Sequence, residues 1–175
     1  NLQTHKYVLI TDGDIVFTNK NAINYLLENI EDNDMVIQSS LKNAVCSGFF
    51  MLRSNEKTIK LFDPINVEKE KTKEKWGDQK YINEIKAKLK YKRLPYELYP
   101  IGAVYYEKFK DINPYIIHFN YVLADKKRKR MKKYNHWYLN NYKMTLEEWQ
   151  KTKKPINSLL VQGTPTDGKS GWQDW

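Results

Sequence analysis

The fold is decided near the start of the chain, by the stretch Tyr7-Val8-Leu9-Ile10-Thr11-Asp12-Gly13-Asp14. Its first four residues form a continuous apolar run, which is typical of a strand buried on both faces. The run stops at an aspartate-rich turn, so two carboxylates follow the carboxyl end of this strand. Because open α/β sheets bind ligands beyond the carboxyl ends of their strands, this turn is a candidate functional site.

Helices and further strands alternate after the turn. Apolar residues at spacings of three and four predict a helix over residues 19–30, and strands are expected over 35–39 and 48–53, on either side of a polar turn. Ser54 or Asn55 would cap a helix that ends near Pro64, and Asp78 would cap another that carries Tyr81 inward. The intervening residues 68–75 alternate in charge and predict a solvated connector.

The remaining segments are shorter and are broken by proline and glycine. Extended structure is expected over residues 91–99 and around Val104 and Ile116, and a capping box at Thr145 and Glu148 predicts a last short helix. This order of strands and helices predicts an α/β layer fold, with a mixed sheet flanked by helices.

Length and composition limit the classes of protein that fit. The 175 residues suit one domain, over residues 1–161, followed by a flexible tail over 162–175. Cys46 is the single cysteine, which excludes an intrachain disulfide and a cysteine-cluster zinc site. No apolar run approaches the roughly 20 residues that span a bilayer, so we expect a soluble chain. Because the chain starts at Asn1, just before a core strand, we expect it to be a fragment of a longer protein.

The Asp12-Gly13-Asp14 turn is the strongest candidate for chemistry. The glycine would allow both carboxylates to face one divalent cation, which takes oxygen ligands and removes their mutual repulsion. Aspartate and glycine are also common in ordinary turns, and the spacing alone does not decide between the two interpretations.

Other segments carry weaker signals. His118 follows an apolar segment, and as a third ligand it would tilt the site from magnesium toward manganese, although a lone histidine there is more often structural. Gly48 would let a ligand approach the backbone, although a turn glycine explains it equally well. A helix-capping role is the simplest explanation of Asp78, and it is compatible with a catalytic one. Seven of the eight residues over 126–133 are basic, which fits a nucleic-acid patch, a loop that neutralises a diphosphate, or a solvated face.

Together these segments resemble the nucleotide-diphospho-sugar transferase family, glycosyltransferases of the GT-A fold with a DxD motif. The resemblance rests on four motifs in the family's order: residues 8–17, residues 46–54, Trp76-Gly77-Asp78-Gln79, and His118-Phe119-Asn120. It covers roughly residues 7–137. It implies a glycosyltransferase that moves a sugar from a nucleoside diphosphate to an acceptor hydroxyl, on a GT-A-like mixed sheet.

The resemblance also implies roles for single residues. Asp14 and His118 would hold Mn²⁺ or Mg²⁺, with Asp12 on the metal or on the nucleotide ribose. Asp78 would be the catalytic residue, facing sugar and acceptor. The pocket for the donor would include Ser47 and Gly48, and a lysine after His118 would meet the diphosphate, with Lys126, Lys127 and Lys129 as candidates.

One part of the family's pattern is missing. GT-A enzymes carry a βαβ nucleotide-binding half before the DxD strand, and almost nothing precedes residue 7 here. We therefore expect an upstream segment or a second chain to complete the donor site, or a degenerate relative kept as a structural part. The expected partners are a nucleotide-sugar and a carbohydrate or protein acceptor, rather than nucleic acid. The cytoplasm is favoured over a Golgi lumen, which would require a removed upstream anchor.

Two other functions stay open. Haloacid-dehalogenase-like phosphatases also place Asp-x-Asp after a buried strand, with the first aspartate as nucleophile and the second as acid. That interpretation leaves the motifs at Gly48, Asp78 and His118 unexplained. A non-catalytic module would instead bind polyanions or other proteins through the basic run.

Overall fold

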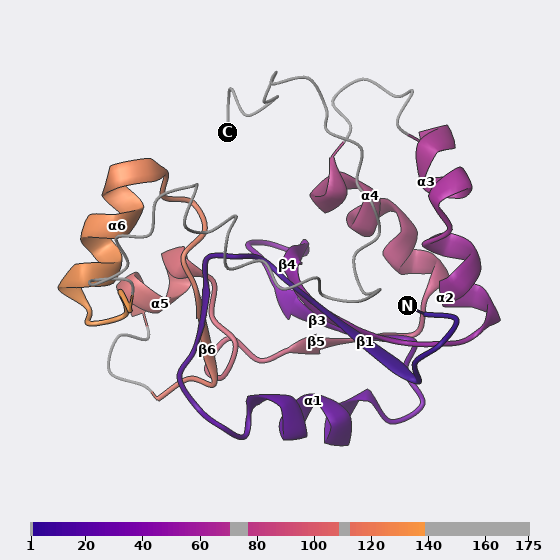
Figure 1. Ribbon diagram of the computed structural model, residues 1–175, viewed down its shortest axis with the longest axis horizontal. Coiled ribbons are helices and arrows are strands. Elements are labelled where there is room, and N and C mark those ends of the chain that lie inside the picture. Colours follow the sequence, from indigo (N-terminus) through magenta and orange to yellow (C-terminus); the bar gives the residue numbers. More distant parts are fainter. Residues whose placement is uncertain (1, 71–76, 109–112, 139–175) are drawn as a thin grey trace, which may run out of the picture. The chain divides into compact units, whose positions relative to one another are not determined.

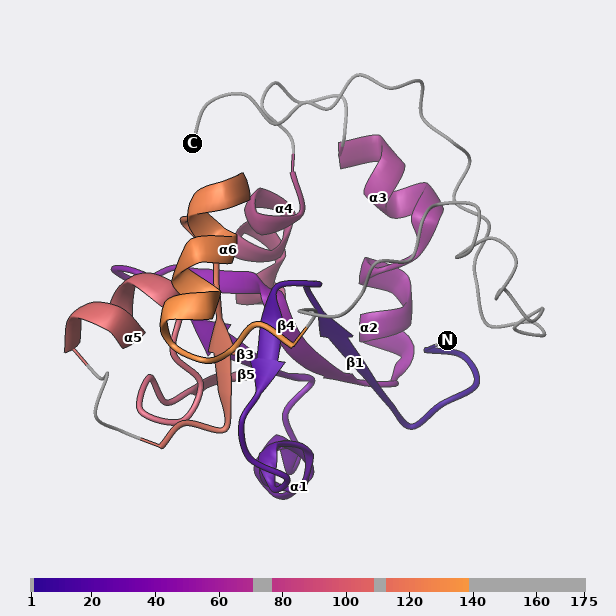
Figure 2. The same cartoon turned by 60° about the vertical axis from the view of Figure 1, so that its left-hand side comes forward.

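The structure, a computed structural model, describes residues 2–70, 77–108 and 113–138. Strands and helices alternate along the described chain (Figures 1 and 2). In chain order they are β1 (Tyr7–Thr11), β2 (Ile15–Phe17), α1 (Ala22–Ile30), β3 (Met35–Ser39), β4 (Val45–Arg53), α2 (Glu56–Leu61), α3 (Pro64–Glu70), α4 (Asp78–Ile85), the short 3₁₀ helix η1 (Lys86–Lys88), β5 (Tyr91–Leu94), α5 (Gly102–Lys108), β6 (Ile116–His118) and α6 (Ala124–Lys133).

Four strands form one mixed sheet in the order β1-β4-β3-β5. β4 pairs antiparallel with β1 and with β3, whereas β3 pairs parallel with β5. β1, β3 and β5 therefore run in one direction, and their carboxyl ends lie at the same edge of the sheet. The predicted α/β fold, with a mixed sheet flanked by helices, is confirmed.

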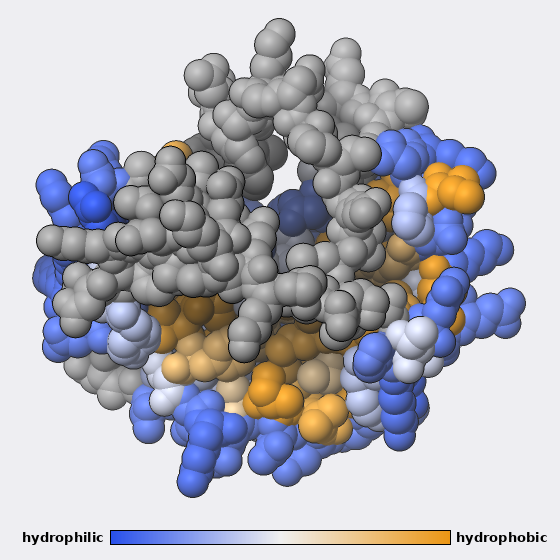
Figure 3. Space-filling view, in the orientation of Figure 1, coloured by the Kyte–Doolittle hydropathy of each residue, from blue (hydrophilic) through white to orange (hydrophobic). Residues whose placement is uncertain are grey.

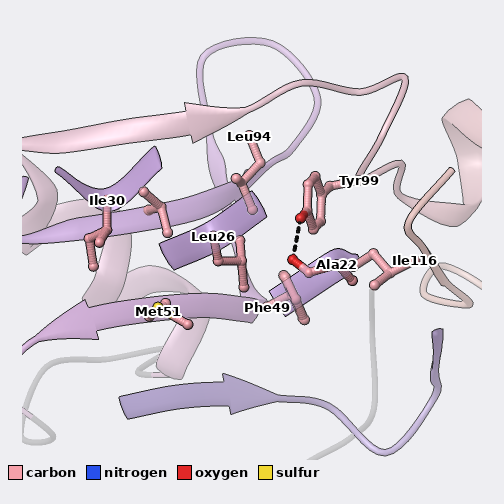
Figure 4. Close-up of a cluster of buried hydrophobic side chains, with 9 residues drawn as sticks. Ala22, Leu26, Ile30, Phe49, Met51, Leu94, Tyr99 and Ile116 are labelled. Carbon is pink, nitrogen blue, oxygen red and sulfur yellow. Dashed lines mark hydrogen bonds between the residues drawn. The ribbon is translucent and has the colours of Figure 1, made fainter. Parts of the chain in front are cut away.

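Each face of this sheet has its own apolar core, because successive side chains of a strand point to opposite faces. Phe49 of β4 packs in a cluster with Leu26 of α1, shown in Figure 4. Phe50, the next residue, packs with Ile82 of α4 on the other face. Burying such a side chain stabilises the fold by about 1.5 to 3 kcal/mol, so the alternation along β4 holds helices against both faces.

Tyr99 ties the α1 core together. Its ring stacks on Phe49 with 5.6 Å between centroids, and its hydroxyl donates a 2.7 Å hydrogen bond to the Ala22 carbonyl (Figure 4). Burial raises the pKa of Tyr99, so the hydroxyl stays protonated and keeps this bond. A polar group therefore joins helix α1 to the segment after β5 without an unsatisfied donor.

β1 differs from the strand that its sequence predicts. It lies at the edge of the sheet, and its apolar residues are half-buried rather than buried. Leu9 packs against the core beside α1, and Ile10 packs against the core beside α4. Both faces are thus partly covered, which explains the unbroken apolar run at an edge position. Figure 3 shows apolar surface in the lower middle of the view, where Figure 1 places α1.

The helix before Pro64 ends as predicted, at Leu61, and Pro64 opens helix α3, because a proline at the first helical position loses no hydrogen bond. Three other local predictions are wrong. Val104 lies in helix α5, not in a strand, since Ile101 and Val104 are buried at helical spacing. Gly77 is the N-cap of α4, so Asp78 stands inside the first turn. The basic run over residues 126–133 is helical, in α6.

The structure refines two further predictions, and three others concern residues that it does not describe. Asn55, not Ser54, caps α2, with a capping box to Thr58. Strand β4 begins three residues earlier than expected, at Val45. The capping box at Thr145, the tail over 162–175 and Trp76 lie outside the described residues. None of the helices in the described ranges has both the length and the apolar character needed to cross a membrane.

Candidate functional site

Asp12 and Asp14 follow β1 at the carboxyl edge of the sheet. The amide of Asp12 donates to the Gly48 carbonyl at 2.8 Å, which extends the pairing of β1 with β4 by one residue. The carboxylate of Asp14 is mostly buried, with 19% of its side chain exposed, while that of Asp12 is half exposed. The backbone pairing thus delivers both side chains to the same end of β4.

The two-stranded pairing of β2 with β6 brings His118 to the aspartates. Ile15 lies opposite His118 in this register, and the Phe119 amide donates to the Asp14 carbonyl at 3.0 Å. His118 is 1% exposed, and its Nε2 lies 3.4 Å from Asp12 Oδ2 and 3.2 Å from Asp14 Oδ1. Ligand atoms of all three residues therefore fall within 4.8 Å of one another.

The backbone of Gly48 makes room for this approach. A Cβ atom at position 48 would lie 2.4 Å from Asp12 Oδ2 and 2.4 Å from His118 Cε1. Real side chains do not tolerate such distances, so only glycine permits the observed packing here. Because Gly48 has no Cβ, Asp12 and His118 can approach each other over its backbone.

The other ring nitrogen of His118, Nδ1, contacts Gln38 and Cys46, on the side of the ring away from the aspartates. Nδ1 lies 2.8 Å from Gln38 Oε1 and 3.6 Å from Cys46 Sγ. Nε2, in contrast, has no hydrogen-bond partner among the described residues although it is buried. A buried nitrogen that faces two carboxylate oxygens without a hydrogen bond fits a position where a cation is held.

The charges of the cluster depend on one another. Burial lowers the pKa of His118, but its contacts with Asp12 and Asp14 outweigh burial and raise that pKa to about 11. Burial raises the pKa of Asp14, but its contacts with His118 and Lys127 outweigh burial and lower that pKa to about 2. A proton on Nε2 and a divalent cation are alternatives for the same position, because the same two carboxylates attract both.

Lys127 is the basic residue that α6 directs into the cluster. Its Nζ lies 2.5 Å from Asp14 Oδ2, and 27% of its side chain is exposed. Lys126 and Lys129 are exposed on the same helix and, within the described residues, make no ion pair with the aspartates. Of the three lysines that the sequence offers for the diphosphate, the structure brings Lys127 to the site.

Ser47 and Asp78 form a neighbouring group of side chains. The hydroxyl of Ser47 lies 3.0 Å from Gln79 Oε1 and 3.3 Å from Asp78 Oδ2. The Ser47 amide also donates to Gln79 Oε1, at 2.8 Å. Asp78 is exposed and accepts from the Gln79 amide at 2.7 Å. The start of α4 is thus fastened to β4 directly beside Gly48, and it presents one carboxylate to solvent.

Sequence analysis missed two residues that support these groups. Gln38 follows three apolar residues in strand β3, and an amide at such a position was the available signal. Gln79 belongs to the motif Trp76-Gly77-Asp78-Gln79, but its contact with Ser47 depends on the packing of α4 against β4. Both act through tertiary contacts that neither the spacing nor the composition of the chain reveals.

Comparison with known proteins shows which family and fold the chain resembles. Residues 2–131 match the family described as nucleotide-diphospho-sugar transferase. The UDP-galactose:fucoside alpha-3-galactosyltransferase of Dictyostelium discoideum is 27% identical over 166 residues, which cover 77% of this chain. The chain spans 26% of the length of that relative.

Solved structures show the same fold. A glycosyltransferase involved in the glycosylation of the major capsid of PBCV-1 superposes with a TM-score of 0.56 at 14% identity, over 75% of this chain and 68% of that one. The glycosyltransferase GlyE of Streptococcus pneumoniae TIGR4 superposes with a TM-score of 0.54 at 20% identity, over 77% of this chain and 40% of that one. With the family match over most of its length, the chain belongs to the nucleotide-diphospho-sugar transferase family.

Proposed function

We propose that this chain carries the cation and diphosphate site of a metal-dependent glycosyltransferase, which moves a sugar from a nucleoside diphosphate to an acceptor hydroxyl. One observation carries the proposal: Asp12, Asp14 and His118 converge at the carboxyl edge of the sheet, with Lys127 beside them. Family membership favours sugar transfer over the phosphatase alternative, which shares only the Asp-x-Asp pattern.

Asp12, Asp14 and His118 would hold Mn²⁺ or Mg²⁺. Two carboxylates suit either ion, and the imidazole nitrogen favours manganese. When bound, the cation supplies positive charge that stabilises the negative charge developing on the leaving diphosphate. The Nε2 atom of His118 supports this assignment, because it is buried and faces two carboxylate oxygens without a hydrogen bond.

Lys127 would contact the diphosphate. Its ammonium group lies next to Asp14, so an anion bound at the cluster would lie within reach of a second positive charge. In this partly buried position the attraction is stronger than it would be for the exposed lysines of α6. The contact of Lys127 with Asp14 supports this lysine as the one that would serve the leaving group.

Ser47, Gly48 and Asp78 would face the sugar. The Ser47 hydroxyl is held by Gln79 and Asp78, so its oxygen is oriented before any ligand arrives. Asp78 is an exposed carboxylate in contact with Ser47, and it would accept the proton of the acceptor hydroxyl in an inverting reaction. For the donor we propose UDP-galactose as the first compound to test, since the relative from Dictyostelium is named for it.

The test is ligand-dependent stabilisation of the 175-residue chain. Mn²⁺ with UDP at about 100 times the dissociation constant should stabilise the folded state by about 2.7 kcal/mol, which raises the melting temperature. Asp14→Asn should abolish the shift, because a neutral amide replaces a charged ligand of the same shape. Asp125→Asn is the matched control, since Asp125 is exposed on α6 and pairs only with Arg128 among the described residues.

The outcomes separate the candidate functions. An undiminished shift in Asp14→Asn contradicts the assignment of the cation site. Mn²⁺-dependent release of galactose from UDP-galactose supports a transferase, whereas release of inorganic phosphate supports a phosphatase. A folded chain with neither reaction and with strong polyanion binding supports the non-catalytic alternative.

A further inference from the structure

Gln38 is a fully buried glutamine at the carboxyl end of β3, with 0% of its surface exposed. It follows three apolar residues, Met35, Val36 and Ile37, whose side chains all lie in the two cores of the sheet. Burying an amide costs free energy unless its polar atoms are hydrogen-bonded. The position therefore calls for a role that an apolar side chain would not fill.

The contacts of Gln38 determine which way its amide points. The nitrogen Nε2 lies 3.2 Å from the Tyr99 carbonyl and 3.0 Å from the Pro100 carbonyl. Carbonyl oxygens only accept hydrogen bonds, so the NH₂ group must face them. The oxygen Oε1 is thereby directed to Nδ1 of His118, at 2.8 Å.

An oxygen acceptor at Nδ1 determines the tautomer of the ring. Because Oε1 has no proton to donate, Nδ1 must carry the hydrogen and donate it. In the neutral ring the lone pair then belongs to Nε2, the nitrogen that faces Asp12 and Asp14. Cys46 Sγ lies farther from Nδ1, at 3.6 Å, and sulfur is the weaker acceptor.

We propose that Gln38 is a positioning residue for the cation site, holding His118 in the Nδ1–H tautomer with the Nε2 lone pair directed between the two carboxylates. The proposal rests on the proposed function, since it assumes that the cluster binds a divalent cation. Histidines that bind metals commonly donate their other N–H to an oxygen, and this partner sets both the tautomer and the ring orientation. Gln38 does more than fill space in the core, because its Oε1 contacts Nδ1 of His118, while the proposed ligand atom is Nε2 of the same ring.

The experiment compares two variants that lose the same amide nitrogen. Gln38→Met removes the acceptor oxygen along with the two bonds to carbonyls, whereas Gln38→Glu keeps an oxygen at the ring. Loss of such a partner weakens metal binding by about 10- to 100-fold, so Gln38→Met should bind Mn²⁺ that much more weakly. Gln38→Glu should bind close to wild type. Free Mn²⁺ is measured by electron paramagnetic resonance, without reference to transferase activity.

A second control accounts for general loss of packing. Ser39→Ala removes a buried hydrogen bond, from Ser39 Oγ to the Leu94 carbonyl at 2.8 Å, on the same strand but away from His118. It should lower the melting temperature and leave Mn²⁺ affinity unchanged. Equal weakening of Mn²⁺ binding in Ser39→Ala and Gln38→Met would overturn the proposal, because stability alone would then explain both.

Nitrogen-15 spectroscopy of the imidazole rings gives the direct reading. The chain has three histidines, so the signals of His118 are assignable with one variant. With Mg²⁺ bound, the wild-type spectrum should show a protonated Nδ1 and a metal-bound Nε2. A metal-bound Nδ1 would overturn the proposal even if Gln38→Met does not fold.

Failure of the proposed function is a separate result. If the wild-type chain binds neither Mn²⁺ nor Mg²⁺, the proposed cation site is wrong. The exchange rate of the Nδ1 proton still tests Gln38 in that case, because its hydrogen bond protects the proton. Faster exchange in Gln38→Met supports the contact, and unchanged exchange refutes it.

Discussion

Gly48 is the residue at which the backbone itself shapes the site. Its missing Cβ leaves the space that Asp12 and His118 occupy. Gly13, between the two aspartates, has no such role: nothing lies within 4 Å of where its Cβ would be, and no described glycine has a positive φ. The sequence-based argument that Gly13 aims the carboxylates is therefore wrong, and the requirement for glycine lies at position 48.

We predict that Gly48→Ala and Gly13→Ala differ sharply in Mn²⁺ affinity. The added methyl at position 48 must displace Asp12, whose side chain is half exposed, because buried His118 has nowhere to move. Overpacking of this kind costs about 1 to 3 kcal/mol, so Gly48→Ala should fold with a lower melting temperature and bind Mn²⁺ weakly. Gly13→Ala should bind as wild type. Similar affinities for the two variants, measured by titration with Mn²⁺, would contradict this account.

Asp34 is the buried carboxylate that joins three parts of the structure. Its oxygens accept hydrogen bonds from Asn55 Nδ2, Lys57 Nζ and the Lys90 amide, each at 2.8 Å. Burial raises the pKa of Asp34, but these hydrogen bonds outweigh burial and lower the pKa below its usual value. The start of α2 and the segment before β5 are both fastened to the start of β3 through this carboxylate.

We predict that Asp34→Asn lowers the free energy of unfolding by about 1.5 to 3 kcal/mol, because hydrogen bonds to a charged group are lost. Since the folded-state pKa is lowered, the stabilisation by Asp34 is present above the unfolded pKa and disappears as pH falls through the folded value. The difference between wild type and variant should therefore shrink below about pH 4. Urea unfolding at several pH values measures it.

Asp32→Asn is the control for this experiment. Asp32 pairs with Lys90 on the surface, with 73% of its side chain exposed. Exposed pairs contribute little, so this variant should unfold as wild type does. A loss of stability in Asp32→Asn as large as that in Asp34→Asn would show that net charge, not the buried hydrogen bonds, is responsible.

Helix α6 directs some of its basic side chains toward the protein and others toward solvent. Lys127, Arg130 and Met131 lie at helical spacings of three and four, and all face the protein. Lys127 contacts Asp14, Arg130 lies 5.0 Å from the Tyr106 ring, and Met131 packs on a buried cluster around Phe119. These contacts explain why seven cations in eight residues form a helix, although a loop is one of the interpretations that their sequence permits.

We predict that Lys127→Met weakens the binding of UDP with Mn²⁺ and that Lys129→Met does not. Loss of a charge-assisted contact of about 1.5 to 3 kcal/mol corresponds to at least about tenfold weaker binding of UDP with Mn²⁺. Only Lys127→Met should show it, because Lys129 points to solvent. Isothermal titration calorimetry at fixed ionic strength makes the comparison. Equal affinities would mean that α6 contributes only a diffuse positive field.

The whole molecule assembles the site from separated segments. Lys127 and Asp14 are 113 residues apart in the chain, and Gln38 and His118 are 80 apart. The two-stranded β2–β6 pair, the carboxyl edge of the main sheet and the start of α6 must all be in place together. Binding of ligand should therefore stabilise these segments jointly rather than one at a time.

We predict that Mn²⁺ with UDP slows hydrogen exchange in three regions: residues 11–15, 45–48 and 118–127. The amides of α2 and α3, over residues 56–70, should exchange at unchanged rates, because these helices contact the core beside α4 and not the cluster. Mass spectrometry of peptides from wild type and Asp14→Asn provides the comparison. Protection confined to residues 11–15, or equal protection in the variant, would refute a jointly assembled site.

Much of the arrangement follows from local sequence. The apolar run from Tyr7, the aspartates after it and the helical spacing from Ala22 to Ile30 each express a short-range rule, and the structure has a strand, a turn and a helix there. The mixed sheet also follows, because the order of elements restricts the topologies available. Where two short-range rules compete, as at Val104 and over residues 126–133, the sequence alone led to the wrong element.

The sequence by itself determined which residue types stand at the ends of which strands, and hence the family and the candidate ligands. Only the tertiary structure decided that β1 is an edge strand, that Lys127 rather than Lys126 or Lys129 meets Asp14, and that Gln38 stands behind His118. These facts depend on strand register and helix docking between segments far apart in the chain. Local periodicity carries no information on such contacts, because a shift of one residue in register would leave every local pattern unchanged and would exchange the faces of the strand.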